Sequence, residues 1–223
     1  MTHFIKREKA LALRKKEMSY SQIKKILRVS KSSLSLWLRD YPLSKKRIRE
    51  LGANNESRIE KYRETRKRTK DKRLLKYYNE QKKNVFPLGK RDVFIAGLFL
   101  YWGEGTKTSL THLSLSNTNP SVIIFFIKWI QVVLKIPKHK IRFAMHFYED
   151  MDVKKETAFW AKILNVKESQ FSKPYIKKSS FLRINQKGTF GHGTCNARVY
   201  NARFSEQILM AIKAISDKQI KLL

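Results

Sequence analysis

Apolar and polar positions follow two different periods along the chain. Residues 19–39 carry apolar side chains three and four positions apart, the spacing of amphipathic helices. Four later segments have the composition of strands, and residues 110–116 alternate between apolar and polar. These predicted strands are 110–116, 140–148, 171–176 and 194–200, and helices are expected at 120–134, 153–164 and 205–220. Strands mixed with helices in this order predict an α+β fold for the C-terminal part of the chain.

The N-terminal pattern predicts two short helices joined by a turn at residues 28–30. Ser19 and Gln22 have the spacing of a capping box, and Ser30 is a good N-cap for a second helix over residues 31–39. Ile23, Ile26 and Leu27 share one face of the first helix. Leu34, Trp37 and Leu38 form a stripe on the second helix that would pack against it. The opposite face carries small polar and basic residues, which a DNA major groove accepts: Lys31, Ser32, Ser33, Ser35 and Arg39.

Residues 4–40 resemble the helix-turn-helix of resolvases and transposases. The resemblance rests on the Val-Ser-Lys-Ser-Ser-Leu run that begins at Val29 and on the Trp-Leu pair that follows it. It implies binding to double-stranded DNA through the second helix. The alternative is a structural three-helix bundle that does not touch nucleic acid.

The distribution of charge and of helix breakers divides the chain into three parts. We expect a helix-turn-helix domain over residues 1–44, a basic helical linker over residues 45–90 and an α+β domain over residues 91–223. Gly52 and its neighbours predict a break between two linker helices. Arg66 and Lys70 are candidates for contacts along a phosphate backbone, and a solvated linker helix is the alternative.

Net charge strengthens the case for a nucleic-acid partner. The 223 residues include 49 Lys and Arg against 18 Asp and Glu, a formal charge of +31. Such an excess is the usual mark of proteins that neutralise phosphates, although a ribosome-associated protein or a membrane-surface binder is an alternative. The chain has one cysteine and no apolar run of the roughly 20 residues that would span a membrane. We therefore expect an intracellular protein, cytoplasmic or nucleoid-associated.

The segment from Val93 to Gly105 is apolar except for Glu104 near its end. If it is helical, its composition predicts burial on more than one side. Gly105 is a natural residue for a left-handed C-cap, and a carboxylate at a helix C-terminus is disfavoured by the helix dipole. A divalent cation at Glu104 would offset that repulsion, and an ion pair with Lys107 is the alternative.

This segment resembles the signature helix of the LAGLIDADG homing-endonuclease superfamily, which ends in an acidic residue and glycine. The resemblance implies a saddle of about four strands, a homodimer that pairs two such helices, and Mg²⁺ held by Glu104. It assigns catalytic roles to Glu104 and Lys107 and DNA contacts to Lys173, Lys177 and Lys178. The implied function is a double-strand DNA endonuclease. A transcription regulator that keeps the fold without cleavage is the alternative, and an RNA-associated role is a third.

Two other groups of chemically active side chains predict no site. Glu149, Asp150 and Asp152 are expected to form a helix cap and an acidic loop. His192 and Cys195 lack a second pair at zinc-binding spacing.

Overall fold

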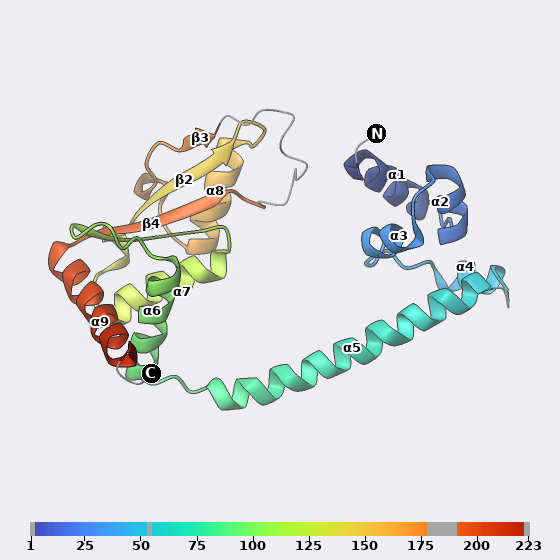
Figure 1. Ribbon diagram of the computed structural model, residues 1–223. Coiled ribbons are helices and arrows are strands. Elements are labelled where there is room, and N and C mark those ends of the chain that lie inside the picture. The colour runs from blue at the N-terminus through green and yellow to red at the C-terminus, as the bar shows by residue number, and fades with distance from the viewer. Residues whose placement is uncertain (1–2, 53–54, 178–190, 221–223) are drawn as a thin grey trace. The chain divides into compact units, whose positions relative to one another are not determined.

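The computed structural model describes residues 3–52, 55–177 and 191–220 (Figure 1). The chain forms two compact units, Met1–Pro87 and Leu88–Leu223. Each unit has its own hydrophobic core.

The first unit begins with the predicted helix-turn-helix. Helices α1 (His3–Lys15), α2 (Tyr20–Leu27) and α3 (Lys31–Trp37) surround a small core in which Ala10, Ile23 and Leu34 are fully buried. The predicted capping box is present, since Ser19 and Gln22 exchange hydrogen bonds, and the Ser30 side chain caps α3. Ile26 is 54% exposed, so its expected place on the buried face is wrong. Helix α2 is only eight residues long, and its side toward the core is occupied by Ile23 and Leu27, one turn apart.

The expected break in the basic segment is confirmed. Helix α4 (Lys45–Glu50) ends before Gly52, whose φ of +65° is a conformation that favours glycine, and α5 (Asn55–Val85) follows. Ser57 and Glu60 near the start of α5 are buried, whereas the side chains from Glu64 to Val85 are exposed. The first turns of α5 therefore pack within this unit, and the remainder presents its surface to solvent.

The second unit is an α+β domain built on a four-stranded sheet. Its strands are β1 (His112–Asn117), β2 (Arg142–Tyr148), β3 (Tyr175–Lys177) and β4 (Thr194–Tyr200). They lie in the order β1-β4-β2-β3, in which β2 and β3 are parallel and the other pairs are antiparallel. The predicted α+β class and the number of strands in this sheet are confirmed, but β3 begins at Tyr175 and not at the expected residue 171. Phe171 makes only an isolated bridge to Phe143.

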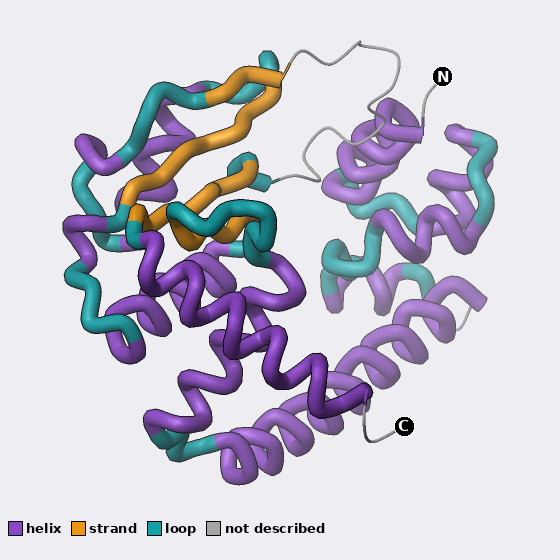
Figure 2. Tube along the Cα trace, turned by 60° about the vertical axis from the view of Figure 1, so that its left-hand side comes forward, coloured by secondary structure: helices purple, strands orange, loops and turns teal. Residues whose placement is uncertain are grey.

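Helices cover one face of this sheet. They are α6 (Lys90–Glu104), α7 (Pro120–Val133), α8 (Val153–Leu164) and α9 (Ala202–Ile220), and Figure 2 shows the strands as a layer beside helices. Odd-numbered strand residues such as Leu113, Phe143 and Ala197 are buried against helix residues such as Phe126 and Trp160. The expected caps are present, because Asn119 and Asp152 accept hydrogen bonds from the first turns of α7 and α8.

Helix α6 is buried on more than one side, as expected, because it packs against α7, α9 and β1. One stripe of the helix, formed by Ala96, Phe99 and Gly103, stays exposed. The left-handed C-cap predicted at Gly105 is wrong, because this residue has φ −79° and ψ 159°. The chain leaves α6 in an extended conformation and bridges to Leu115.

The glycine at position 105 is explained by packing. A Cβ added to Gly105 would lie 2.3 Å from Cδ2 of Tyr101, whose ring covers it. Tyr101 in turn donates a hydrogen bond from its hydroxyl to the Thr106 carbonyl oxygen.

No helix within the described parts of the chain combines the length and the apolar character that crossing a membrane requires.

Candidate nucleic-acid interface

The outer surface of α3 carries most of the side chains expected to contact DNA. Lys31, Ser32 and Ser35 are exposed on α3. Arg39 is exposed too, but it lies in the turn that follows, because α3 ends at Trp37 and not at the expected residue 39. Ser33 is half-buried, and its hydroxyl lies 2.9 Å from the Ser30 hydroxyl, which also lies 2.8 Å from that of Ser32. The serines therefore complete the helix cap as well as forming the surface.

Beside α3 lies a shallow hollow with a cationic rim. Its lining comes from α2, the turn and the start of α3: Ser21, Lys24, Lys25, Arg28, Val29, Ser30 and Lys31. Four of these seven residues are basic, so the hollow attracts anions. The sequence reasoning did not single out Lys24, Lys25 and Arg28, although their position next to the turn was a usable signal.

The position of α3 is fixed by contacts from α5. The Arg63 guanidinium donates to the Ser35 carbonyl oxygen at 3.3 Å and stacks 4.4 Å from the centre of the Tyr20 ring. The Arg14 guanidinium lies 4.8 Å from the centre of the same ring. Burial, and then repulsion from Arg14, lower the pKa of Arg63. Arg63 thus links α5 to α2 and α3 through its contacts with Tyr20 and Ser35.

Further along α5, Arg66 and Lys70 are exposed as expected. The helix carries twelve Lys and Arg against five Asp and Glu. The Arg66 guanidinium lies 5.6 Å from the centre of the Tyr62 ring, so this surface combines cations with an aromatic side chain.

The second unit exposes the face of its sheet that the helices leave uncovered. Even-numbered residues of β1, β4 and β2 point to this face, opposite to the buried odd-numbered ones. The strand register aligns these residues in cross-strand rows: His112 with Tyr200; Ser114 with Arg198 and Arg142; Ser116 with Asn196 and Ala144; Thr194 with His146 and Tyr175; and Tyr148 with Lys177. We call the residues of these rows the open sheet face.

The open sheet face is basic and aromatic. None of the four strands contains Asp or Glu, whereas Arg142, Arg198 and Lys177 supply positive charge. At the β1 edge Ser114 is buried, and its hydroxyl donates to the Thr106 hydroxyl at 2.9 Å. Across β4, β2 and β3 the aromatic side chains of Tyr200 and Tyr175 are 64% and 63% exposed. This surface therefore suits a partner that carries phosphates and aromatic rings.

Side chains on the open sheet face hold one another in place. Arg198 donates to the Tyr200 hydroxyl at 3.2 Å, and the His112 ring lies 5.6 Å from the Tyr200 ring. Burial, and then the nearby Arg198 charge, lower the pKa of His112, so this imidazole is neutral near pH 7. The His146 and Tyr175 rings lie 5.7 Å apart, and the Lys177 ammonium lies 5.9 Å from the centre of the Tyr148 ring.

Of the predicted lysines, Lys177 belongs to this face, and Lys173 lies exposed in the segment that precedes β3. Lys178 falls outside the described residues. The sequence reasoning missed Arg142, Arg198, Tyr175 and Tyr200. Their alternation with buried residues was the available signal, but the side of the sheet covered by helices is a tertiary property.

Glu104 is the last residue of α6 and its carboxylate is exposed. The Asn117 side-chain nitrogen lies 3.5 Å from Glu104 Oε2, and the Asn117 side-chain oxygen accepts from the Asn119 backbone N–H at 2.8 Å. The alternative ion pair with Lys107 does not form. The Lys107 ammonium instead donates to the Trp102 carbonyl oxygen at 2.8 Å, which caps the C-terminal end of α6.

No group of three or more metal-ligating side chains occurs among the described residues. The titratable side chains of Glu156, His192 and Cys195 lie away from the open sheet face and have structural roles. Glu156 Oε2 lies 2.6 Å from His192 Nδ1, and the His192 ring stacks on Phe159. Cys195 is buried, and burial raises the pKa of its thiol to about 12, so it is not a nucleophile near pH 7.

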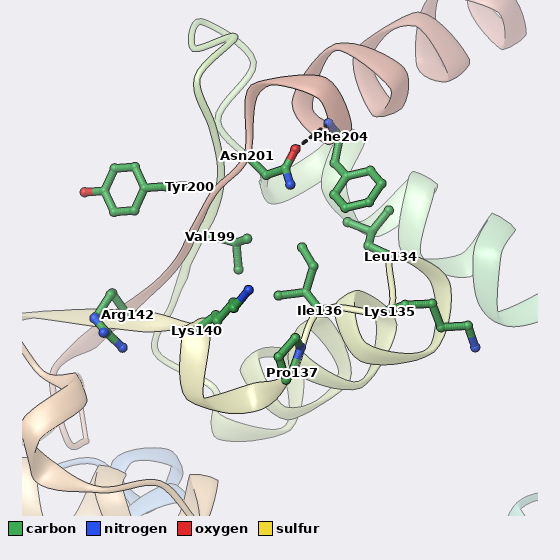
Figure 3. A pocket seen from close by; sticks show the side chains of 10 residues that line it. All are labelled: Leu134, Lys135, Ile136, Pro137, Lys140, Arg142, Val199, Tyr200, Asn201 and Phe204. Carbon is green, nitrogen blue, oxygen red and sulfur yellow. Dashed lines mark hydrogen bonds between the residues drawn. The ribbon is translucent and has the colours of Figure 1, made fainter.

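A shallow hollow lies where β4 ends and β2 begins (Figure 3). Val199, Ile136 and Phe204 form an apolar floor, while Lys140 extends its ammonium group over it. Arg142 and Tyr200 stand at its rim and belong to the open sheet face as well, so the hollow continues that face with another cation.

Comparisons with protein-family models, with curated proteins and with solved structures found no match to this chain.

Proposed function

We propose that this protein binds double-stranded DNA, with the helix-turn-helix of its first unit as the reading element. The observation that carries the proposal is the capped α2–turn–α3 arrangement, with Lys31 and Ser35 exposed on α3 and Arg39 exposed in the turn after it. Short polar and basic side chains at the start of a helix suit contacts with base edges in the major groove. The binding partner would place the protein in the cytoplasm or at the nucleoid.

Positive charge supports the same proposal. On three surfaces, the hollow beside α3, the exposed part of α5 and the open sheet face, Lys and Arg outnumber Asp and Glu. Phosphate contacts made by such surfaces release counterions, which adds affinity for any DNA sequence. The helix-turn-helix would then select among sequences that these contacts already hold.

We further propose that α6 pairs with its counterpart in a second copy. Ala96, Phe99 and Gly103 lie three and four residues apart on one side of α6, and Phe99 is 49% exposed. A Cβ added to Gly103 would meet nothing within 4 Å, so that side leaves room for another helix. A dimer also suits a helix-turn-helix, because two reading helices bind two half-sites.

Titration of a fluorescent duplex with the full chain tests the main proposal. A log–log plot of affinity against salt should have a slope steeper than about −3, at roughly −0.9 for each phosphate neutralised. A shallower slope, or equal affinity for duplexes of all sequences in a random library, would count against it.

Metal-dependent cleavage of the duplex is the second candidate, and Glu104 favours it. A single chain does not fit a metal site there, because Glu104 supplies one carboxylate and the neighbouring Asn117 turns its amide nitrogen toward it. Pairing of α6 would bring a second Glu104 close, and two carboxylates would suit Mg²⁺, which could supply a hydroxide and stabilise the leaving oxygen. A regulator that binds without cutting is the alternative function for the same dimer.

A further inference from the structure

We propose that the open sheet face binds an unpaired strand of DNA by stacking its bases on Tyr200 and Tyr175. The proposal rests on the proposed function, because it adds a second mode of binding to a DNA-binding protein. It concerns bases that are out of the duplex, whereas the helix-turn-helix would contact bases inside it.

Aromatic side chains with free ring surfaces are the first argument. The Tyr200 and Tyr175 side chains are 64% and 63% exposed, although tyrosine can bury a large apolar area. Each is steadied from one side by a histidine, His112 and His146 respectively. A tyrosine held in this way offers a base a flat and preorganised surface, and base–aromatic stacking tolerates any sequence.

Positive charge beside each aromatic group is the second argument. Arg198 and Arg142 lie next to each other on neighbouring strands near Tyr200, and Lys177 lies at the opposite corner near Tyr148. The strands that form the face contain no carboxylate that would repel phosphates. The cations thus match the backbone of a strand whose bases lie on the tyrosines.

The distance between the two tyrosines is the third argument. Tyr200 and Tyr175 lie diagonally across the face, since Tyr175 lies in the row of Thr194, two strands from β4. With about 3.4 Å per residue along a strand and about 4.8 Å between strands, the backbones of the two tyrosines are about 23 Å apart. The row of Arg198 and Arg142 and then the row of Ser116, Asn196 and Ala144 lie between them, so a short strand crossing the face would pass two guanidinium groups and then smaller side chains.

Two unsatisfied polar atoms lie along this path. Asn196 Oδ1 and Arg198 Nε are buried and have no hydrogen-bond partner among the described residues, although Asn196 Nδ2 donates to the Ser116 hydroxyl at 2.7 Å. Buried polar atoms normally have partners. Asn196 Oδ1 can accept and Arg198 Nε can donate, so polar groups of a nucleic acid on this face could supply the missing partners.

The test uses the full chain and a single-stranded oligodeoxynucleotide of about 12 residues that contains 2-aminopurine, whose fluorescence reports stacking. Tyr200→Ala and Tyr175→Ala should each weaken binding roughly 5- to 150-fold and reduce the fluorescence change. Tyr200→Phe and Tyr175→Phe keep the ring and should bind like the wild type. Met210→Ala, at a residue 57% exposed on α9, is the matched control and should change nothing.

The outcomes separate this inference from the proposed function. Single-strand binding that is unchanged in both Tyr→Ala variants overturns the inference, and intact duplex binding leaves the proposed function standing. An equal loss of duplex and single-strand binding would make the face a duplex-docking surface and also overturns it. Tighter binding of an RNA of the same sequence would also overturn the inference. Loss of the dimer in the Tyr→Ala variants, measured by sedimentation, would overturn it as well. Absence of duplex binding in the wild type would instead contradict the proposed function.

Discussion

Arg14 on α1 and Glu60 on α5 form a buried ion pair in which Arg14 Nη2 lies 2.8 Å from Glu60 Oε1. The two side chains are only 1% and 6% exposed. Arg14 also donates to the Tyr41 and Met18 carbonyl oxygens, so its guanidinium joins four segments of the first unit. The start of α5 is therefore a structural part of the helix-turn-helix unit.

Removal of the carboxylate should destabilise that unit. Glu60→Ala leaves a buried guanidinium without its counter-charge, and we expect a loss of about 3 kcal/mol in the free energy of unfolding. Glu64→Ala, at an exposed position one turn further along, is the matched control and should cost little. Hydrogen exchange of the α1–α3 amides measures the difference. Equal protection in the two variants would contradict this role for the ion pair.

Changes on the outer surface of α3 should alter sequence preference. Lys31→Ala and Arg39→Ala should each cost about 1–3 kcal/mol of discrimination at the base pairs they contact, since a good base contact is worth that much. Selection of bound duplexes from a random library measures the preference. Lys218→Ala, at an exposed lysine on α9, removes the same charge far from the reading helix in sequence and should leave the preferred site unchanged. An unchanged preference in the α3 variants would show that this helix does not read bases.

Two glycines of α6 should respond in opposite ways to alanine. A Cβ at Gly97 would lie 2.0 Å from the Trp129 ring, so Gly97→Ala should destabilise the second unit by about 1–3 kcal/mol or more. Gly103 faces open space, and Gly103→Ala should stabilise the helix by up to about 1 kcal/mol. Urea unfolding of the two variants compares them. A bulkier change, Gly103→Leu, should preserve folding and weaken the proposed dimer, which sedimentation measures.

The cleavage hypothesis makes a separate prediction at Glu104. Glu104→Gln should retain folding and duplex binding but abolish Mg²⁺-dependent cutting, because the amide keeps the size and loses the charge that holds the cation. Glu149→Gln, at an exposed carboxylate that follows β2, is the control and should still cut. Gel analysis of a plasmid library with Mg²⁺ detects the cuts. A wild-type protein that binds and never cuts would favour the regulator instead.

Cys195 should contribute a loss of stability at high pH. Burial raises the pKa of its thiol in the folded protein from the ordinary value of 9.0 to about 12. A raised folded pKa means that stability is complete below about pH 9 and falls as the pH rises toward 12, because the unfolded chain releases its proton first. Cys195→Ala should flatten that decline, as measured by urea unfolding at successive pH values. A thiol reagent should react with the native protein at pH 8 only as fast as the chain opens.

Local elements were predictable because their signals lie within a few residues. The capping box at Ser19, the N-cap at Ser30 and the Asn119-Pro120 start of α7 depend on hydrogen bonds and backbone angles close in sequence, and all three are present. The bounds of α8 and β4 also agree with the prediction, since strong periodicity and nearby caps mark their ends.

Tertiary packing decided which residues of these helices and strands are buried and which are exposed. Sequence alone determined that α6 is apolar, but the position of α7 decided that Gly97 is buried and that Phe99 is exposed. Alternation predicted strands, whereas the order β1-β4-β2-β3 brought Arg142, Arg198 and Tyr175 onto one surface from segments far apart in the chain. Side-chain period is a local property of a strand, but which side the helices cover depends on contacts between distant segments. For that reason the open sheet face emerged only from the folded structure.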